Sequence, residues 1–242
     1  MTTNGVKLPE LAHDLAAAGL RRINVSLDSL QPATYQLLTK RDELARVLEG
    51  IDAALDAGLA PVKVNCVVMR GVNDHEIADL AAFGRAKGVG IRFIEFMPLD
   101  AQGRWTPDSV VSASEILERI DAVFPLADRP AQGGSSQAHV DPAERFHYAD
   151  GIGDVGVIAS VTVPFCEQCD RIRVTSEGRL RTCLFALDEY DLRAIVRDAP
   201  DRDVDDRLAA EIERAVAGKW AGHRIGRVDF VRPPRSMSQI GG

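Results

Sequence analysis

The feature that most constrains the fold of this 242-residue chain is a repeated alternation of helix-forming and strand-forming segments in its first hundred residues. Three times, apolar residues at helical spacing end at a glycine (Gly19, Gly58 and Gly88), and a short β-rich run follows. The three runs are residues 22–27, 62–68 and 91–96. This alternation predicts right-handed βαβ crossovers and a parallel sheet. Both a doubly wound sheet and part of a (β/α) barrel fit the pattern.

Polar residues interrupt all three expected strands. The interruptions are Asn24 and Ser26, Lys63 and Asn65, and Arg92 and Glu95. Parallel strands are usually continuous apolar runs, because both faces of the sheet are buried. A buried charge is costly unless it is paired or lines a polar cavity, and the lumen of a barrel supplies such a cavity near its active site. Because the feature recurs in three strands, we favour a cavity over a solvent-exposed rim.

The start of the sequence suggests a fold that needs completion. Thr2-Thr3-Asn4-Gly5 is turn-like and is interpreted as the exit from a preceding strand. Only three complete helix–strand units are expected, and an open three-stranded parallel sheet would leave an exposed edge. We therefore expect another copy or an N-terminal region to complete the sheet.

Composition excludes several functional classes. The net charge of −7 and the sequence pI of about 5.3 argue against nonspecific binding to nucleic acid or to an anionic membrane. No apolar run approaches the roughly 20 residues that a membrane span requires. Four unevenly spaced cysteines do not form a secreted disulfide framework. A cytoplasmic location with neither a nucleic-acid nor a membrane partner is expected.

The pattern changes after residue 98, where we expect a domain boundary between residues 1–98 and 99–242. Ser112 and Glu115 predict a capping box at the start of a helix. Residues 127–142 carry no periodicity and predict a loop, and residues 155–163 are β-rich. Leu208, Ile212 and Ala215 indicate a late helix.

Three of the four cysteines lie in the stretch FCEQCDRIRVTSEGRLRTCLF, from Phe165 to Phe185. Cys166 and Cys169 form a C-x2-C pair, and Cys183 follows later. Residues 171–174 alternate between charged and apolar side chains and predict a strand. Glu177-Gly178 predicts a turn, and residues 180–184 predict the returning strand. The expected hairpin brings Cys183 back towards the C-x2-C turn.

These residues by themselves leave the chemistry open. Thiolates are soft ligands, and three of them without an obvious fourth suggest a centre with one open position. On this evidence an iron–sulfur cluster and a zinc site are about equally favoured, and inert thiols are less favoured. A zinc site would need a fourth ligand, and the nearest histidines in sequence are His147 and His223. The arginines of the hairpin form either an anion site or a solvated face. Cys66, among apolar strand residues, is expected in the core.

A combination of motifs closely resembles the molybdenum cofactor biosynthesis protein A family, the GTP 3',8-cyclases of the radical S-adenosylmethionine (SAM) superfamily. The motifs are the cysteine stretch, Thr2-Thr3-Asn4-Gly5, residues 24–29, residues 92–98 and the terminal Gly241-Gly242. The resemblance runs over essentially the whole chain. It implies an α/β fold, with a partial (β/α)6 TIM-type barrel followed by a C-terminal α+β domain that holds an iron–sulfur site. It also implies conversion of GTP with SAM into (8S)-3',8-cyclo-7,8-dihydroguanosine 5'-triphosphate.

The resemblance also implies roles for individual residues. Cys166, Cys169 and Cys183 match the ligands of a C-terminal [4Fe-4S] cluster whose open iron takes the guanine of GTP. Thr2, Lys63 and the segment Arg171-Ile172-Arg173 match GTP-binding positions, and Ser26 and Met97 match SAM contacts. Gly241 and Gly242 match a tail that assists the rearrangement. Implied partners are GTP, SAM, an electron donor, a second copy in a homodimer, and the downstream cyclic pyranopterin monophosphate synthase.

The sequence departs from the family in one respect. The N-terminal C-x3-C-x2-C motif, which holds a second [4Fe-4S] cluster and cleaves SAM in the family, does not occur in these 242 residues. We therefore expect a truncated form that lacks cyclase activity alone. Two alternatives stay open: a non-catalytic Fe–S or GTP-binding module working with a partner, and a zinc-stapled binding protein.

Overall fold

The computed structural model describes residues 1–127, 142–198, 201–219, 222, 223, 225 and 230–240. The chain divides into two compact units. The first unit comprises Met1–Phe96 and Asp108–Val163, and the second comprises Met97–Pro107 and Pro164–Gly242. The expected boundary after residue 98 lies close to the change at Phe96. However, residues 108–163, expected in the second domain, return to the first unit.

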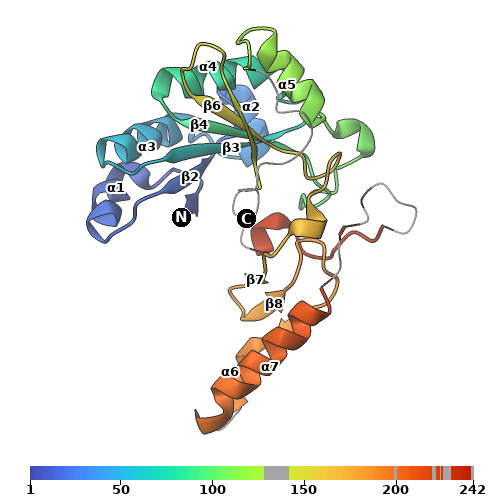
Figure 1. The fold of residues 1–242 in the computed structure, drawn as a ribbon. Helices are drawn as coiled ribbons and strands as arrows, with labels where there is room; N and C mark the ends of the chain where they lie inside the picture. Colours follow the sequence, from blue (N-terminus) through green and yellow to red (C-terminus); the bar gives the residue numbers. More distant parts are fainter. Residues whose placement is uncertain (128–141, 199–200, 220–221, 224, 226–229, 241–242) are drawn as a thin grey trace. The chain divides into compact units, whose positions relative to one another are not determined.

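The first unit contains a six-stranded sheet in the order β1-β2-β3-β4-β6-β5 (Figure 1). Its strands are β1 (Thr2–Thr3), β2 (Ile23–Ser26), β3 (Val62–Val68), β4 (Gly90–Glu95), β5 (Glu144–His147) and β6 (Asp154–Ile158). All neighbours are parallel except β5, which runs antiparallel to β6 at the edge. The predicted α/β fold with a parallel sheet is confirmed, and it is consistent with a partial radical SAM barrel.

Three strands were expected in this sheet, and that count is wrong. Thr2-Thr3, interpreted as a turn, forms β1 and pairs with β2. The β-rich run 155–163 contributes only β6, which ends at Ile158 and pairs with β4 across a long insertion. Local pattern alone did not reveal either pairing.

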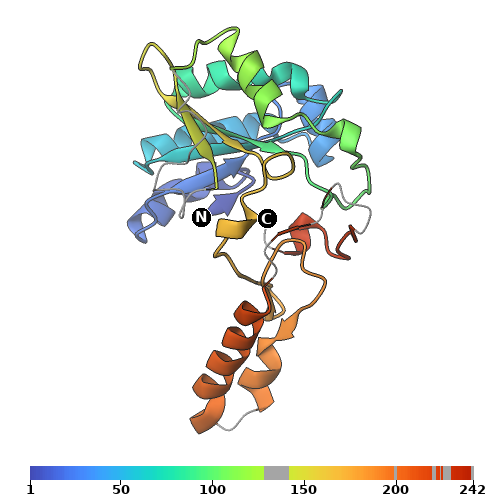
Figure 2. The ribbon, with the colours of Figure 1, turned by 45° about the vertical axis from the view of Figure 1, so that its right-hand side comes forward.

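Helices lie against one face of the sheet (Figure 2). They are α1 (Leu8–Ala17), α2 (Pro32–Thr39), α3 (Leu44–Asp56), α4 (Ile77–Lys87) and α5 (Ala113–Asp121), with short 3-10 turns at Asp74–Glu76 and Pro107–Ser109. Two glycines allow close approach. A Cβ on Gly50 of α3 would lie 2.4 Å from the carbonyl oxygen of Gly5, and one on Gly84 of α4 would lie 2.4 Å from Cγ1 of Ile91. Both helices pack closely because these side chains are absent.

The predicted capping box at α5 forms only in part. The Ser112 hydroxyl accepts a hydrogen bond from the backbone N–H of Glu115 at 3.2 Å, as expected. The Glu115 carboxylate instead pairs with Arg70 and Arg119. Ion pairing to two guanidinium groups thus replaces the second half of the box.

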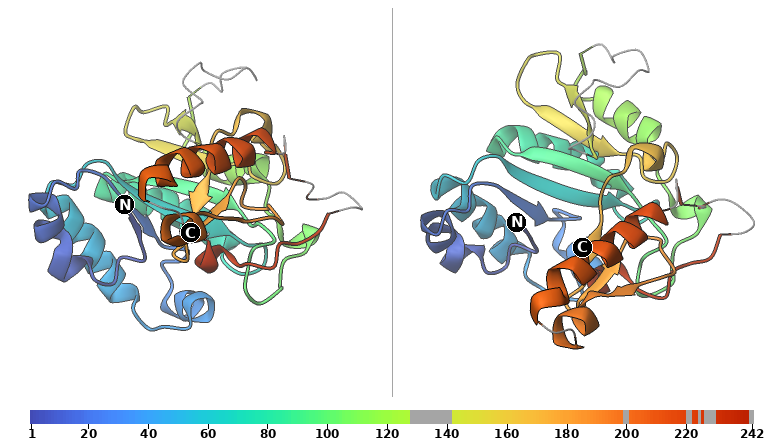
Figure 3. Two further views of the ribbon diagram at one scale, coloured as in Figure 1. Left: turned by 90° about the horizontal axis from the view of Figure 1, so that it is seen from below. Right: turned by 60° about the horizontal axis from the view of Figure 1, so that its bottom comes forward.

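The second unit contains a small antiparallel sheet and two helices. The sheet orders β7 (Arg173–Val174), β8 (Arg179–Arg181) and β9 (Tyr190–Asp191). Helices α6 (Leu192–Asp198) and α7 (Val204–Ala217) lie side by side (Figure 3), and 3-10 turns occur at Cys166–Gln168, Asp201–Asp203 and Met237–Gln239. The hairpin and the late helix are confirmed, whereas β9 and α6 were not predicted.

Part of the sequence-based prediction lies outside the described residues. Most of the loop expected at residues 127–142 falls there, as do Gly241 and Gly242. Within the described ranges, no helix has the length and apolar character needed to cross a membrane.

Candidate functional site

The polar strand residues of the first unit, with the exception of Glu95, share the sheet face opposite the helices. In β3 the even-numbered residues Val62, Val64, Cys66 and Val68 are buried, while Lys63 and Asn65 are half-buried on the other face. Because successive residues of a strand point to opposite faces, this alternation separates a core face from a polar face. Lys63 is therefore not in the apolar core.

Register places the predicted ligand positions of the first unit in two adjacent rows on this polar face. Thr2 pairs with Asn24, and Asn24 pairs with Lys63. In the next row Ser26 pairs with Asn65, and Asn65 pairs with Arg92. The structure thus brings Thr2, Ser26 and Lys63 onto one face of one sheet.

Glu95 corrects the cavity interpretation. It lies on the helix-covered face of β4 and is fully buried. Its carboxylate accepts hydrogen bonds from the backbone N–H groups of Ala113 at 2.8 Å, Val161 at 2.7 Å and Thr162 at 2.8 Å. The residue anchors the start of α5 and the segment after β6. Its position three residues after Arg92 already requires the opposite face, a parity that the sequence interpretation overlooked.

A partly buried polar cluster lies where β2 and β3 end. Asp28 accepts a hydrogen bond from the Val67 N–H at 2.8 Å, and the Asn73 amide donates to the backbone oxygens of Asp28 and Val67. Burial raises the pKa of Asp28 to about 6, although the Val67 hydrogen bond opposes the shift. Cys66 lies in the core as predicted, and burial raises the pKa of its thiol. This cluster joins loops to strands and was not predicted.

In the second unit, the C-x2-C pair forms a tight turn. Cys166 begins a 3-10 turn, and the N–H of Cys169 donates to the carbonyl oxygen of Cys166 at 3.2 Å. Cys183 lies two residues after the end of β8, and its sulfur accepts a hydrogen bond from the N–H of Phe185 at 3.4 Å. All three side chains are half-buried free thiols.

The electrostatics of the cysteines differ. Burial raises the pKa of Cys183, and the charges of Cys166 and Cys169 raise it further, so the three sulfurs influence one another. Burial also acts to raise the pKa of Cys169, but hydrogen bonds from Arg171 and the charges of Arg171 and Lys219 outweigh it and leave this pKa lowered. A lowered pKa favours the thiolate, which is the form that binds metals.

The donor set fits a soft metal centre, although the described residues do not assemble one. No group of three or more His, Cys, Asp or Glu within the described part of the chain lies close enough to hold a metal ion. Three free thiols in one short stretch, with the pKa of Cys169 lowered, are nevertheless the kind of donor set that iron–sulfur clusters use. The ring of His223, the candidate zinc ligand in this unit, is tilted against that of Phe185, with the ring centroids 5.1 Å apart. Its Nδ1 accepts a hydrogen bond from the Ile225 N–H at 3.2 Å.

The four hairpin arginines divide into two classes. Arg179 pairs with Asp191 at 2.8 Å, and buried Arg181 pairs with Glu189 at 2.5 Å. Within the described residues, neither Arg171 nor Arg173 has a carboxylate partner, and Arg171 lies over the Phe165 ring at 5.0 Å. Burial lowers the pKa of Arg173, and the charge of Arg171 lowers it further. Two adjacent cations without a paired acid suit an anionic ligand.

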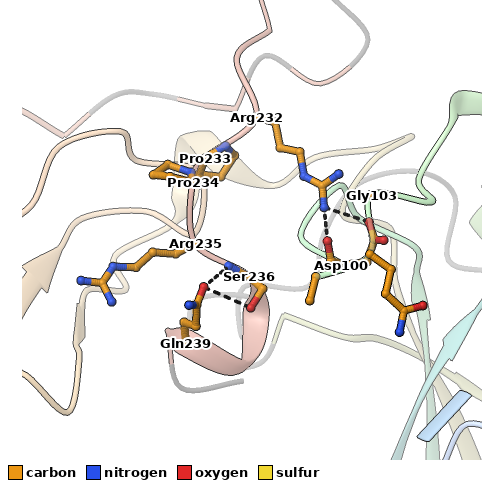
Figure 4. Close-up of a pocket in the computed structure, with 10 residues that line it drawn as sticks. Asp100, Gly103, Arg232, Pro233, Pro234, Arg235, Ser236 and Gln239 are labelled. Carbon is orange, nitrogen blue, oxygen red and sulfur yellow. Dashed lines mark hydrogen bonds and ion pairs between the residues drawn. The ribbon is translucent and has the colours of Figure 1, made fainter. Parts of the chain in front are cut away.

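A polar pocket of about 650 Å³ lies elsewhere in the second unit (Figure 4). Its lining comes from residues 100–103, residues 232–236 and Gln239. Arg232 donates to the backbone oxygen and the carboxylate of Asp100, and the side chain of Gln239 accepts from the N–H of Ser236 at 2.8 Å. No predicted site residue lines this pocket. Met97 lies outside it, half-buried, and its carbonyl accepts from the N–H of Leu99.

Comparison with known proteins identifies the family. The chain is 49% identical, over its whole length, to the GTP 3',8-cyclase of Streptomyces coelicolor, of which it covers 69%. The chain belongs to the GTP 3',8-cyclase family. A GTP 3',8-cyclase of Paenarthrobacter nicotinovorans is 45% identical with 70% of its length covered, and GTP 3',8-cyclase 2 of Mycobacterium tuberculosis is 44% identical with 66% covered.

Two family descriptions match successive parts of this cyclase-family chain. The Radical SAM superfamily matches residues 1–84, and Molybdenum Cofactor Synthesis C matches residues 89–225. The resemblance drawn from the motifs is therefore confirmed.

Proposed function

We propose that this chain serves the cyclase reaction of molybdenum cofactor biosynthesis, the conversion of GTP with SAM into (8S)-3',8-cyclo-7,8-dihydroguanosine 5'-triphosphate. The observation that carries the proposal is 49% identity over the whole chain to a protein named for this reaction. The cysteine and arginine chemistry of the second unit supports it.

In this proposal the second unit binds GTP. Cys166, Cys169 and Cys183 hold a [4Fe-4S] cluster, which supplies an open iron for the guanine. Arg171, Ile172 and Arg173 present the triphosphate-binding segment. The absence of a described carboxylate partner for either arginine supports this role, because a paired guanidinium would bind phosphate less well. Ile172 is exposed and contributes its backbone.

The polar face of the first unit contributes the remaining contacts. Lys63 and Thr2 bind GTP, and Ser26 contacts SAM; Met97 is proposed as a further SAM contact. Thr2 and Lys63 both pair in register with Asn24, which supports a common ligand for Thr2 and Lys63. Gly241 and Gly242 are proposed to assist the rearrangement.

The partners follow from the same chemistry. An electron donor is required for SAM cleavage, the product passes to cyclic pyranopterin monophosphate synthase, and a homodimer is the proposed assembly. The free thiols suit a reducing compartment such as the cytoplasm.

Anaerobic reconstitution with iron and sulfide tests the cluster. We expect iron–sulfur absorption bands and GTP binding in the wild type, loss of both in Cys183→Ala, and retention of both in the matched control Cys66→Ala, whose thiol is buried in the other unit. A full cluster in Cys183→Ala would reject the ligand assignment. Binding of zinc alone would favour the zinc-stapled alternative.

A second candidate function is a non-catalytic Fe–S or GTP-binding module that works with a partner, for which the cysteine hairpin with Arg171 and Arg173 would be sufficient. The chain would then bind GTP and its cluster while a partner supplies SAM cleavage. Formation of 5'-deoxyadenosine from SAM by the purified 242-residue protein with GTP and a reductant would contradict this candidate.

A further inference from the structure

Lys219 contacts the cysteine hairpin from a distant part of the sequence. Its Nζ donates to the carbonyl oxygen of Arg171 at 2.8 Å and lies 3.8 Å from Sγ of Cys169, within hydrogen-bonding distance of sulfur. Fifty residues separate Lys219 from Cys169. Neither the motifs nor the comparisons assign this lysine a role.

The fold fixes the position of this ammonium group. Helix α7 ends at Ala217, where the N–H of Gly218 donates to Arg214 O at 3.2 Å and that of Lys219 donates to Val216 O at 3.0 Å. A cation just beyond a helix C-terminus is favoured by the helix dipole. The half-buried side chain then extends to the hairpin, so the segment after α7 adds a second positive charge beside Cys169, next to that of Arg171.

The contacts of Lys219 have two chemical consequences. Hydrogen bonds to ligand sulfurs and nearby charge set the reduction potential of an iron–sulfur cluster. A positive charge beside Cys169 stabilises the reduced, more negative state and therefore raises the potential. The bond to the Arg171 carbonyl also restrains the segment that joins Cys169 to Arg173.

We propose that Lys219 is a positioning residue that raises the potential of the cluster held by Cys166, Cys169 and Cys183 and holds the Arg171–Arg173 segment for the triphosphate. This inference rests on the proposed function. Arg171 also hydrogen-bonds to Cys169. When Arg171 engages the triphosphate, Lys219 remains as the cation at the sulfur.

The test compares wild type, Lys219→Met, Lys219→Arg and the control Lys87→Met, in which an exposed lysine of the first unit loses its pairing with Asp52. Each protein is reconstituted anaerobically, its iron and sulfide are quantified, and the midpoint potential is measured by a redox titration followed by electron paramagnetic resonance. GTP affinity is measured by calorimetry on the same samples.

We expect Lys219→Met to shift the reduction equilibrium at least tenfold towards the oxidised state, which is about 59 mV for a one-electron couple. Its GTP affinity falls at least threefold, Lys219→Arg restores most of both properties, and Lys87→Met changes neither. A fully loaded Lys219→Met with unchanged potential and GTP affinity overturns the inference and leaves the proposed function intact.

Failure of the wild type to take up a cluster would overturn the proposed function and this inference together. If Lys219→Met does not load, Lys219→Gln, which keeps a polar side chain without the charge, replaces it. A wild-type potential in that variant overturns the inference, whereas a lowered potential supports it.

Discussion

Glu189 is the residue whose charge we expect to matter most for the stability of the second unit. It pairs with Arg181 at 2.5 Å and with Arg235 at 2.6 Å. The Arg181 side chain is 0% exposed, and its guanidinium also donates to the carbonyl oxygens of Leu184 and Ala186. Arg181 thus holds the segment after Cys183, and among the described residues Glu189 is the only carboxylate that pairs with this buried cation.

The size of the effect of Glu189→Gln follows from these contacts. Removing one partner of a buried ion pair typically costs about 3–5 kcal/mol, because the remaining charge is buried without compensation. The substituted amide keeps one acceptor oxygen, and Arg181 keeps its two carbonyl partners, so we expect the lower range of about 2–4 kcal/mol. The control Glu211→Gln breaks a pair with Arg214, which is 67% exposed, and should cost less than about 1 kcal/mol.

Hydrogen–deuterium exchange of the β8 amides measures this cost within the unit concerned. At about 1.4 kcal/mol for each factor of ten, Glu189→Gln should accelerate their exchange at least about 30-fold. Acceleration of less than about threefold, or the same acceleration in Glu211→Gln, would refute the reasoning.

Acid should reproduce part of the Glu189→Gln effect. Burial acts to raise the pKa of Glu189, but hydrogen bonds from Arg235 and Arg181 outweigh it and leave the pKa lowered. A carboxyl whose folded-state pKa is lowered stabilises the fold above its unfolded-state pKa, and the stabilisation is lost as pH falls through the folded value. Wild-type β8 protection should therefore decrease in acid more steeply than that of Glu189→Gln.

Three other predictions concern the first unit. Asp28→Asn should increase the free energy of unfolding, measured with urea at about pH 7.5, by roughly 1–3 kcal/mol. The pKa of Asp28, about 6, exceeds the ordinary value for an aspartate, so folding opposes its ionised form at high pH. Equal or lower stability of the variant would contradict this explanation. Gly50→Ala should lower the free energy of unfolding by about 1–3 kcal/mol, because the new Cβ would lie 2.4 Å from the carbonyl oxygen of Gly5. In the control Gly90→Ala the new Cβ would meet no atom closer than 3.8 Å. A similar loss of stability in both variants would argue against the packing explanation. Hydrogen bonding from Arg70 lowers the pKa of Glu115 to about 2, and Arg119 adds to the effect. Wild-type stability should therefore fall between about pH 4 and pH 2, and Glu115→Gln should make this fall less steep. An unchanged slope would show that the ion pairs of Glu115 do not cause the acid-dependent loss.

The hairpin that carries the candidate site could be predicted because its signals are local. A C-x2-C turn, an alternating hairpin and a returning cysteine lie within one short stretch, and the hairpin formed as expected. The burial of Cys66 also followed from its neighbours in the strand. The burial of Glu95 could have been found from strand parity, since it stands three residues after Arg92.

The pairing of the arginines could not be predicted. Arg179 and Arg181 look equivalent to Arg171 and Arg173 in sequence. The third strand, β9, supplies Asp191, and the segment before it supplies Glu189. Which arginines are neutralised therefore depends on a strand that the sequence interpretation did not include.

The sequence by itself determined the helix–strand alternation, the parallel sheet and the cysteine hairpin, because hydrophobic period and turn residues act over a few positions. Only the tertiary structure decided that Thr2-Thr3 forms a strand, that β6 joins β4, and that Lys219 meets Cys169. These contacts join segments far apart in the chain, and backbone pairing and helix packing select them among many alternatives of similar local propensity. The local sequence therefore specifies the hairpin and its three cysteines, and the long-range packing specifies the charges around them.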